Sequence, residues 1–141
     1  MTRERVLAEL ATSIANVRLA HPVRVAIDGR GGSGKTTLAA ELATLLVARG
    51  RPVIGTSIDG FHRPKAERYA RGRTSPEGSY HDARDLAAVT TLLLAPLGPG
   101  GDRRYRTTSF DLENDRPIEQ AAALAPADAV LVVDGTFSAA A

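Results

Sequence analysis

The sequence contains no cysteine and only two lysines, Lys35 and Lys65. Without cysteine the chain has no disulfide scaffold, no thiolate site for zinc or an iron–sulfur cluster, and no cysteine nucleophile. No apolar run approaches the roughly 18–20 residues that a membrane-spanning helix needs, which excludes a transmembrane protein. The first residues mix charge signs and lack an apolar core, so we expect a cytoplasmic protein without a membrane partner.

The charge balance does not favour a nucleic-acid partner. Eighteen basic and sixteen acidic residues leave a net charge of +2, and the pI near 9.4 reflects arginine, which stays protonated. Nucleic-acid binding requires a stronger, clustered excess, so we expect none. One basic cluster lies between Arg63 and Arg73. It is either a solvated loop or a segment that meets the anionic groups of a substrate or nucleotide.

The length and the hydrophobic patterning predict one domain over 1–141, of which 43% is apolar. Apolar residues at helical spacing predict three helices: one within 1–20, one over 35–49 and one over 82–94. Short, mostly apolar stretches predict three buried strands: 23–27, 52–58 and 129–134. Because strands and helices alternate, we expect an α/β fold with a parallel sheet that helices flank.

A glycine-rich segment follows the first of these strands and begins the second helix. Residues 29–36 match the pattern G-x-x-x-x-G-K-[ST] at every fixed position. Glycines let a loop turn its N–H groups toward a phosphate, and the helix adds the partial positive charge of its N-terminus. Lys35 supplies a full charge to the β- and γ-phosphates, and the Thr36 hydroxyl suits Mg²⁺. The segment therefore predicts a P-loop NTPase fold.

We expect ATP contacts along this whole segment: Gly29, Arg30, Gly31, Gly32, Ser33, Gly34, Lys35, Thr36 and Thr37. The sequence has no Asn/Thr-Lys-x-Asp element that would read guanine, which favours ATP over GTP.

Two carboxylates stand where predicted strands end. Asp134 closes the strand over 129–134, and Asp59 follows the strand over 52–58. In open α/β sheets ligands bind outside the carboxyl ends of the strands. Asp134 is therefore a candidate Mg²⁺ ligand, directly or through water, with a strand-capping aspartate as the alternative. Asp59 is a candidate to accept a proton from a substrate hydroxyl or to orient it, with a turn aspartate as the alternative.

Residues 27–37, together with Asp59–His62 and Val133–Gly135, resemble the uridine kinase and phosphoribulokinase group of P-loop kinases. Pantothenate kinases are similar around Asp-Gly-Phe, and the resemblance runs from about residue 23 to residue 137. It implies an ATP- and Mg²⁺-dependent kinase that transfers the γ-phosphoryl group to a hydroxyl of a nucleoside-like or related metabolite. It also implies the strand order 2-3-1-4-5. This chain would supply strands 1, 2 and 3 and would lack the C-terminal strands and the lid.

The resemblance also implies roles on the acceptor side. Asp59 matches the catalytic carboxylate and acts together with Lys35, while His62 lies beside the acceptor. Tyr80 and Asp82 look like the family's aromatic residue and aspartate, whose aspartate grips the ribose hydroxyls of the acceptor. Helix capping alone would also explain Asp82.

Residues 102–119 resemble the hairpin that closes over the acceptor. Tyr105 matches its stacking aromatic residue, and we place Arg106 in the same substrate site. Uridine kinases carry a base-reading histidine where this chain has Phe110. A phenyl ring makes no hydrogen bonds, which argues against pyrimidine recognition.

A second hypothesis comes from a different functional class. The phosphate loop also serves nucleotide-dependent switches and assembly ATPases, in which hydrolysis acts on a protein partner. A kinase needs an acceptor pocket and a small-molecule hydroxyl as its partner, whereas a switch needs a water-positioning residue and a partner surface. The residues do not identify the acceptor, and they leave open whether the chain forms a homo-oligomer.

Overall fold

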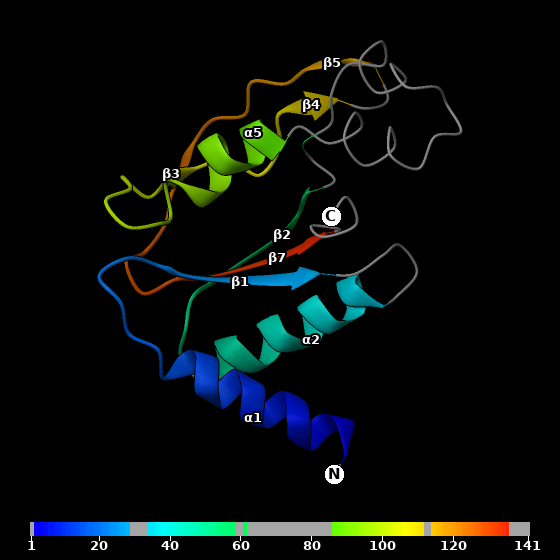
Figure 1. Ribbon diagram of the computed structural model, residues 1–141, viewed down its shortest axis with the longest axis vertical. Coiled ribbons are helices and arrows are strands. Elements are labelled where there is room, and N and C mark those ends of the chain that lie inside the picture. Colours follow the sequence, from blue (N-terminus) through cyan, green and yellow to red (C-terminus); the bar gives the residue numbers. More distant parts are fainter. Residues whose placement is uncertain (1, 29–33, 59–60, 62–85, 112–113, 136–141) are drawn as a thin grey trace.

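The computed structural model describes residues 2–28, 34–58, 61, 86–111 and 114–135 (Figure 1). Its centre is a parallel sheet of three strands: β1 (Val23–Asp28), β7 (Val130–Gly135) and β2 (Val53–Ser57), in that order. In chain order this is the 2-3-1 part of the predicted arrangement, so the α/β prediction is confirmed. Within the described residues β1 forms one edge of the sheet, as the sequence implies.

The middle strand β7 is buried on both faces. Val130 and Val132 belong to a cluster with residues of α1 (Arg3–Ala15) and α2 (Lys35–Ala48). Leu131 and Val133 belong to a second cluster, with residues of α5 (Leu86–Val89) and the π-helix η2 (Thr90–Leu94). Alternate side chains of a strand point to opposite faces, so one apolar run supplies both clusters. Figure 1 shows α1 and α2 on one side of the sheet and α5 on the other.

The N-terminal helix is shorter than the predicted range 1–20. It begins after Thr2, whose hydroxyl accepts a hydrogen bond from the Arg5 backbone N–H, and it ends at Ala15. Its buried positions are Leu7, Ala11 and Ala15. Val6 and Leu10, which share the helical apolar spacing of Leu7, are 48% and 44% exposed. The buried face is shifted because small alanines, rather than these larger residues, pack in the cluster with α2. No helix in the described part of the chain is long and apolar enough to cross a membrane.

A buried arginine bonds the backbone at the end of this helix. The Arg51 side chain is 3% exposed and donates to the backbone carbonyl oxygens of Ala15, Val17 and Asp128, each at 2.8 Å. The Ala15 carbonyl, at the end of α1, thus has a donor outside the helix. Burial, followed by the charge of Arg18, lowers the pKa of Arg51.

The helix predicted over 82–94 is α-helical only in part. Of its described residues, Leu86–Val89 are α-helical and Thr90–Leu94 form a π-helix in which the Ala95 N–H donates to the Thr90 carbonyl (2.8 Å). Pro96 has no N–H to donate to the Leu92 carbonyl four residues earlier. That carbonyl instead accepts a hydrogen bond from the Arg106 N–H at 2.8 Å. The wider turn therefore reflects the position of Pro96 and a tertiary hydrogen bond.

The predicted hairpin region contains two short antiparallel pairs. β4 (Phe110–Asp111) pairs with β5 (Arg116–Pro117), within the predicted range 102–119. β3 (Arg104–Tyr105) pairs with β6 (Ala123–Leu124), which lies beyond that range. The paired segment thus extends to residue 124.

Candidate active site

The carboxyl ends of the three parallel strands lie in one register. Asp134 on β7 is opposite Ile27 on β1 and Ser57 on β2, and Gly135 is opposite Asp28. Because Asp134 is two residues after Val132, its side chain points to the same face, toward α2. The fold therefore brings the aspartate predicted to bind Mg²⁺ to the side of the sheet where α2 begins.

The first turn of α2 begins directly after Gly34, within the predicted phosphate-loop segment. Gly34 precedes the helix with φ of +79°, a left-handed conformation that glycine adopts without steric cost. Lys35 and Thr36 are the first helical residues. The N–H groups of a first helical turn have no acceptor four residues earlier within the helix, and they add to the positive end of its dipole. This end of α2 therefore favours an anion.

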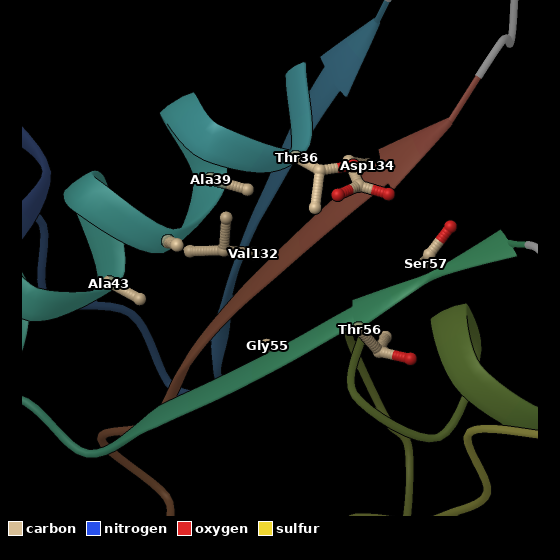
Figure 2. Close-up of a pocket in the computed structure, with 9 residues that line it drawn as sticks. Thr36, Ala39, Ala43, Gly55, Thr56, Ser57, Val132 and Asp134 are labelled. Carbon is tan, nitrogen blue, oxygen red and sulfur yellow. The ribbon is translucent and has the colours of Figure 1, made fainter. Parts of the chain in front are cut away.

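The Asp134 carboxylate has an unsatisfied oxygen. Its side chain is 4% exposed, and Oδ1 has no hydrogen-bond partner among the described residues. Burying a charged oxygen without a partner is costly, so a cation or a donor is expected to complete it. Figure 2 shows Thr36 beside Asp134 and Ser57 on the neighbouring strand end.

These side chains fit a magnesium ion. One carboxylate and one or two hydroxyls are hard oxygen ligands, and Mg²⁺ commonly combines few such ligands with waters and substrate phosphates. Within the described ranges no three or more histidine, aspartate or glutamate side chains come together as a metal cage. The few protein ligands and the unpartnered Asp134 oxygen are both consistent with a site that the phosphates of a nucleotide complete.

Gly135 holds the end of β7 against β2. A Cβ atom added there would lie 2.5 Å from Ile58 Cγ1 and 2.7 Å from Ile58 Cδ1. Any larger residue would push apart the strand end that carries Asp134 and the segment after β2. Gly135 is therefore required for the close approach of these two segments.

A cavity of about 370 Å³ opens between α2 and the sheet. Its lining residues come from three elements: Thr36, Ala39, Ala40 and Ala43 of α2, Gly55, Thr56 and Ser57 of β2, and Val132 and Asp134 of β7. Thr36, Ser57 and Asp134 form the polar end, and alanine, glycine and valine, together with Thr56, line the remainder (Figure 2). Ser57 and Gly55 were not among the predicted site residues. Alternate residues of a strand share a face, so the position of Ser57 beside Asp134 places Gly55, two residues earlier, on that same face.

Several predicted site residues lie outside the described residues: Gly29, Arg30, Gly31, Gly32, Ser33, Asp59, His62, Tyr80 and Asp82. Their roles stay predictions. Among the described residues, the structure brings Thr36 and Asp134 together and places Lys35 and Thr37 in the first turn of α2.

Tyr105 and Arg106 do not line this cavity. Tyr105 pairs with Ala123 and packs against the cluster that contains Ala129, just before β7 begins. Figure 1 shows β3 on the side of the molecule where β7 begins. The acceptor roles of both residues remain predictions.

Gln120, which the sequence analysis overlooked, organises the backbone after Arg106. Its Oε1 accepts hydrogen bonds from the backbone N–H groups of Thr107 (2.7 Å) and Thr108 (3.3 Å). Its Nε2 donates to the Thr107 hydroxyl at 3.2 Å. A glutamine in an otherwise irregular polar stretch carries no local pattern that would identify this role.

No protein-family model and no curated protein matches the chain. Several solved structures, by contrast, are similar to it. One is described as a possible uridine kinase from Bacillus stearothermophilus, with a TM-score of 0.74 and 24% identity over 96% of this chain. A second is described as a putative fructose transport system kinase from Silicibacter sp., with a TM-score of 0.72 and 29% identity over 97%. A third is a D-glycerate 3-kinase from Cryptococcus neoformans, with a TM-score of 0.58 and 17% identity over 95%. The chain spans 72%, 64% and 52% of these three proteins, respectively.

Proposed function

We propose that this chain, which has the fold of the uridine kinase-like P-loop kinases, is an ATP-dependent kinase for a small-molecule hydroxyl. The acceptor class we propose is a nucleoside-like or related metabolite. One observation carries the proposal: the buried Asp134, whose Oδ1 has no partner in the part of the chain that the structure describes, lies beside Thr36 at the N-terminus of α2. A carboxylate, a hydroxyl and a helix N-terminus together suit a nucleotide phosphate with its divalent cation. The kinases with similar structures support the class of reaction.

The residues of α2 and β7 would bind and orient the nucleotide. Thr36 and Asp134 would hold Mg²⁺, which when bound neutralises the charge on the β- and γ-phosphates. Lys35 would pair with the same phosphates, and the first-turn N–H groups would bind their oxygens. All these groups sit on rigid elements, so they are arranged before the substrate arrives.

Asp59 would act on the acceptor. In the proposed reaction the acceptor oxygen forms a bond to the γ-phosphorus, the bond from that phosphorus to the β–γ bridging oxygen breaks, and ADP leaves. The hydroxyl proton passes to the Asp59 carboxylate. The further acceptor contacts we propose come from His62, Tyr80, Asp82, Tyr105 and Arg106. We also propose that the protein acts in the cytoplasm and does not bind nucleic acid.

A coupled assay of ADP release tests this function. The screen covers nucleosides, pantothenate-like alcohols and sugar phosphates, each with ATP and Mg²⁺. We expect Lys35→Ala to abolish acceptor-dependent ADP release, while Arg5→Ala, which removes an exposed cation of α1, leaves it unchanged. Asp59→Asn should reduce turnover and leave ATP affinity nearly intact.

Two results would change this conclusion. If Asp59→Asn also destroys nucleotide binding, the assignment of Asp59 as the base is wrong. If ADP is released at the same rate with and without every acceptor, the chain is a nucleotide-dependent switch or ATPase that acts on a protein partner.

A further inference from the structure

The end of β2 places a hydroxyl group at the candidate metal site. Ser57 is the last residue of β2 and lies opposite Asp134 in the parallel pairing of β2 with β7. Val53 packs in the cluster that contains α2 residues, and alternate residues of a strand share a face, so Ser57 also points toward α2. Thr36, Ser57 and Asp134 therefore reach the polar end of one cavity from three different elements (Figure 2).

We propose that Ser57 is a third protein oxygen ligand of the Mg²⁺ that Thr36 and Asp134 would hold, an assignment that rests on the kinase function proposed above. In this role β2 takes part in binding the metal–nucleotide complex and does not serve only as a strand of the sheet. Ser57 also stands two residues before Asp59 in the sequence, so the same segment carries a metal ligand and the proposed base.

The spacing of the strands permits this coordination. Neighbouring strands of a sheet lie about 4.8 Å apart. Mg²⁺ holds oxygen ligands at about 2.1 Å in an octahedron, so two adjacent ligand oxygens lie about 3 Å from each other. The hydroxyl oxygen of Ser57 is one bond from its Cβ, and the carboxylate oxygens of Asp134 are two bonds from theirs. The two side chains can therefore close the difference while the strands stay in place.

The charge of the lining explains why a neutral ligand is needed. Asp134 is the one charged residue among the described residues that line the cavity. A magnesium ion beside a single carboxylate needs neutral oxygens, together with waters and phosphate oxygens, to fill its six positions. Ser57 and Thr36 supply such oxygens from fixed backbone elements. They add ligands without adding negative charge, which would repel the phosphates of the nucleotide.

Ser57→Ala tests the assignment by comparing nucleotide binding with and without the metal. The affinity for a non-hydrolysable ATP analogue is measured by calorimetry, once with Mg²⁺ and once with EDTA. We expect the substitution to lower the affinity about tenfold with Mg²⁺ and less than about twofold in EDTA. A serine with a purely structural role would lower both affinities by the same factor. Ser13→Ala is the matched control, because Ser13 is exposed on α1 and does not line the cavity.

Ser57→Cys adds a test that keeps the size of the side chain and decides the question alone if Ser57→Ala loses its cooperative thermal transition. The sequence contains no cysteine, so the new thiol is the single one in the chain. Thiolates prefer soft cations, so we expect the ratio of the analogue's affinity with Cd²⁺ to its affinity with Mg²⁺ to rise at least about tenfold. Ser13→Cys should leave this ratio unchanged.

Two outcomes overturn the role of Ser57: Ser57→Ala changes the two affinities by the same factor, or Ser57→Cys leaves the ratio of Cd²⁺ to Mg²⁺ affinities unchanged. If the analogue still binds the unaltered protein in a Mg²⁺-dependent way, the proposed kinase function stands and only Ser57 is removed from the site. If the analogue with Mg²⁺ does not bind the unaltered protein, both the kinase function and the role of Ser57 fail.

Discussion

Replacing Asp134 with asparagine tests whether this residue is a metal ligand or a structural, strand-capping aspartate. In the ligand-free protein its Oδ1 is buried without a partner among the described residues. An amide of the same shape is less costly to bury than a carboxylate. We therefore expect Asp134→Asn to raise the free energy of unfolding of the ligand-free protein, although it alters a candidate active-site residue.

The magnitude follows from the burial of that oxygen. An unsatisfied buried polar group costs about 1–3 kcal/mol, and the variant should recover about that amount. With Mg²⁺ and nucleotide the order reverses. At a ligand concentration about 100 times Kd, binding adds about 2.7 kcal/mol to the unaltered protein. If the substitution raises Kd about 100-fold, the same ligand concentration adds only about 0.4 kcal/mol to the variant.

The assay is urea unfolding with and without Mg²⁺ and a non-hydrolysable ATP analogue, and Asp128→Asn, outside the cavity, is the control. The expected signature is a crossover: the variant is more stable without ligand and less stable with it. The reasoning is refuted if the variant loses more than about 1 kcal/mol without ligand yet keeps the full ligand-dependent gain. Asp134 would then cap the strand and bind no metal.

Three further substitutions test the packing that supports the site. Arg51→Ala leaves three backbone carbonyls without their donor and should cost about 3–5 kcal/mol in urea unfolding; a loss under about 1 kcal/mol would mean that water replaces the arginine. Gly135→Ala should cost about 1–3 kcal/mol because its methyl group meets Ile58, and Ile58→Ala in the same chain should return part of that cost; strict additivity would contradict the contact. Gln120→Ala should cost about 1–2 kcal/mol and speed hydrogen exchange at the Thr107 amide, and unchanged exchange there would show that Gln120 does not hold this segment.

The elements that carry the candidate site were the most predictable ones. Continuous apolar runs between polar breaks predict β7, and the heptad-like leucines from Leu38 to Leu46 predict α2, with Gly50 at its end. Both signals are local, and both elements appear within one or two residues of the predicted bounds. Thr36 and Asp134 could be paired because the carboxyl ends of parallel strands meet at one edge of a sheet.

Other features depended on contacts between distant segments. Arg51 bonds the carbonyl at the end of α1, and Arg106 bonds the Leu92 carbonyl in the π-helical turn, which Pro96 also shapes locally. Each of these partners is separated from its target by more than a dozen residues. Helical periodicity does not contain that information, so it predicts a helix within 1–20 but does not specify that α1 ends at Ala15 or that Ala11 and Ala15 are its buried positions.

Local sequence patterns were enough to predict the parts of the proposed site: a phosphate-loop motif, the helix that follows it and a carboxylate at the end of a buried strand. These follow from local patterns in which glycine conformation, strand burial and helix polarity act over a few residues. The packing of separate elements adds that Asp134 is buried, that its Oδ1 has no partner among the described residues, and that Gly55 and three alanines leave a cavity beside it. Burial and empty space arise where separate strands and helices pack together, and no single segment of sequence specifies them.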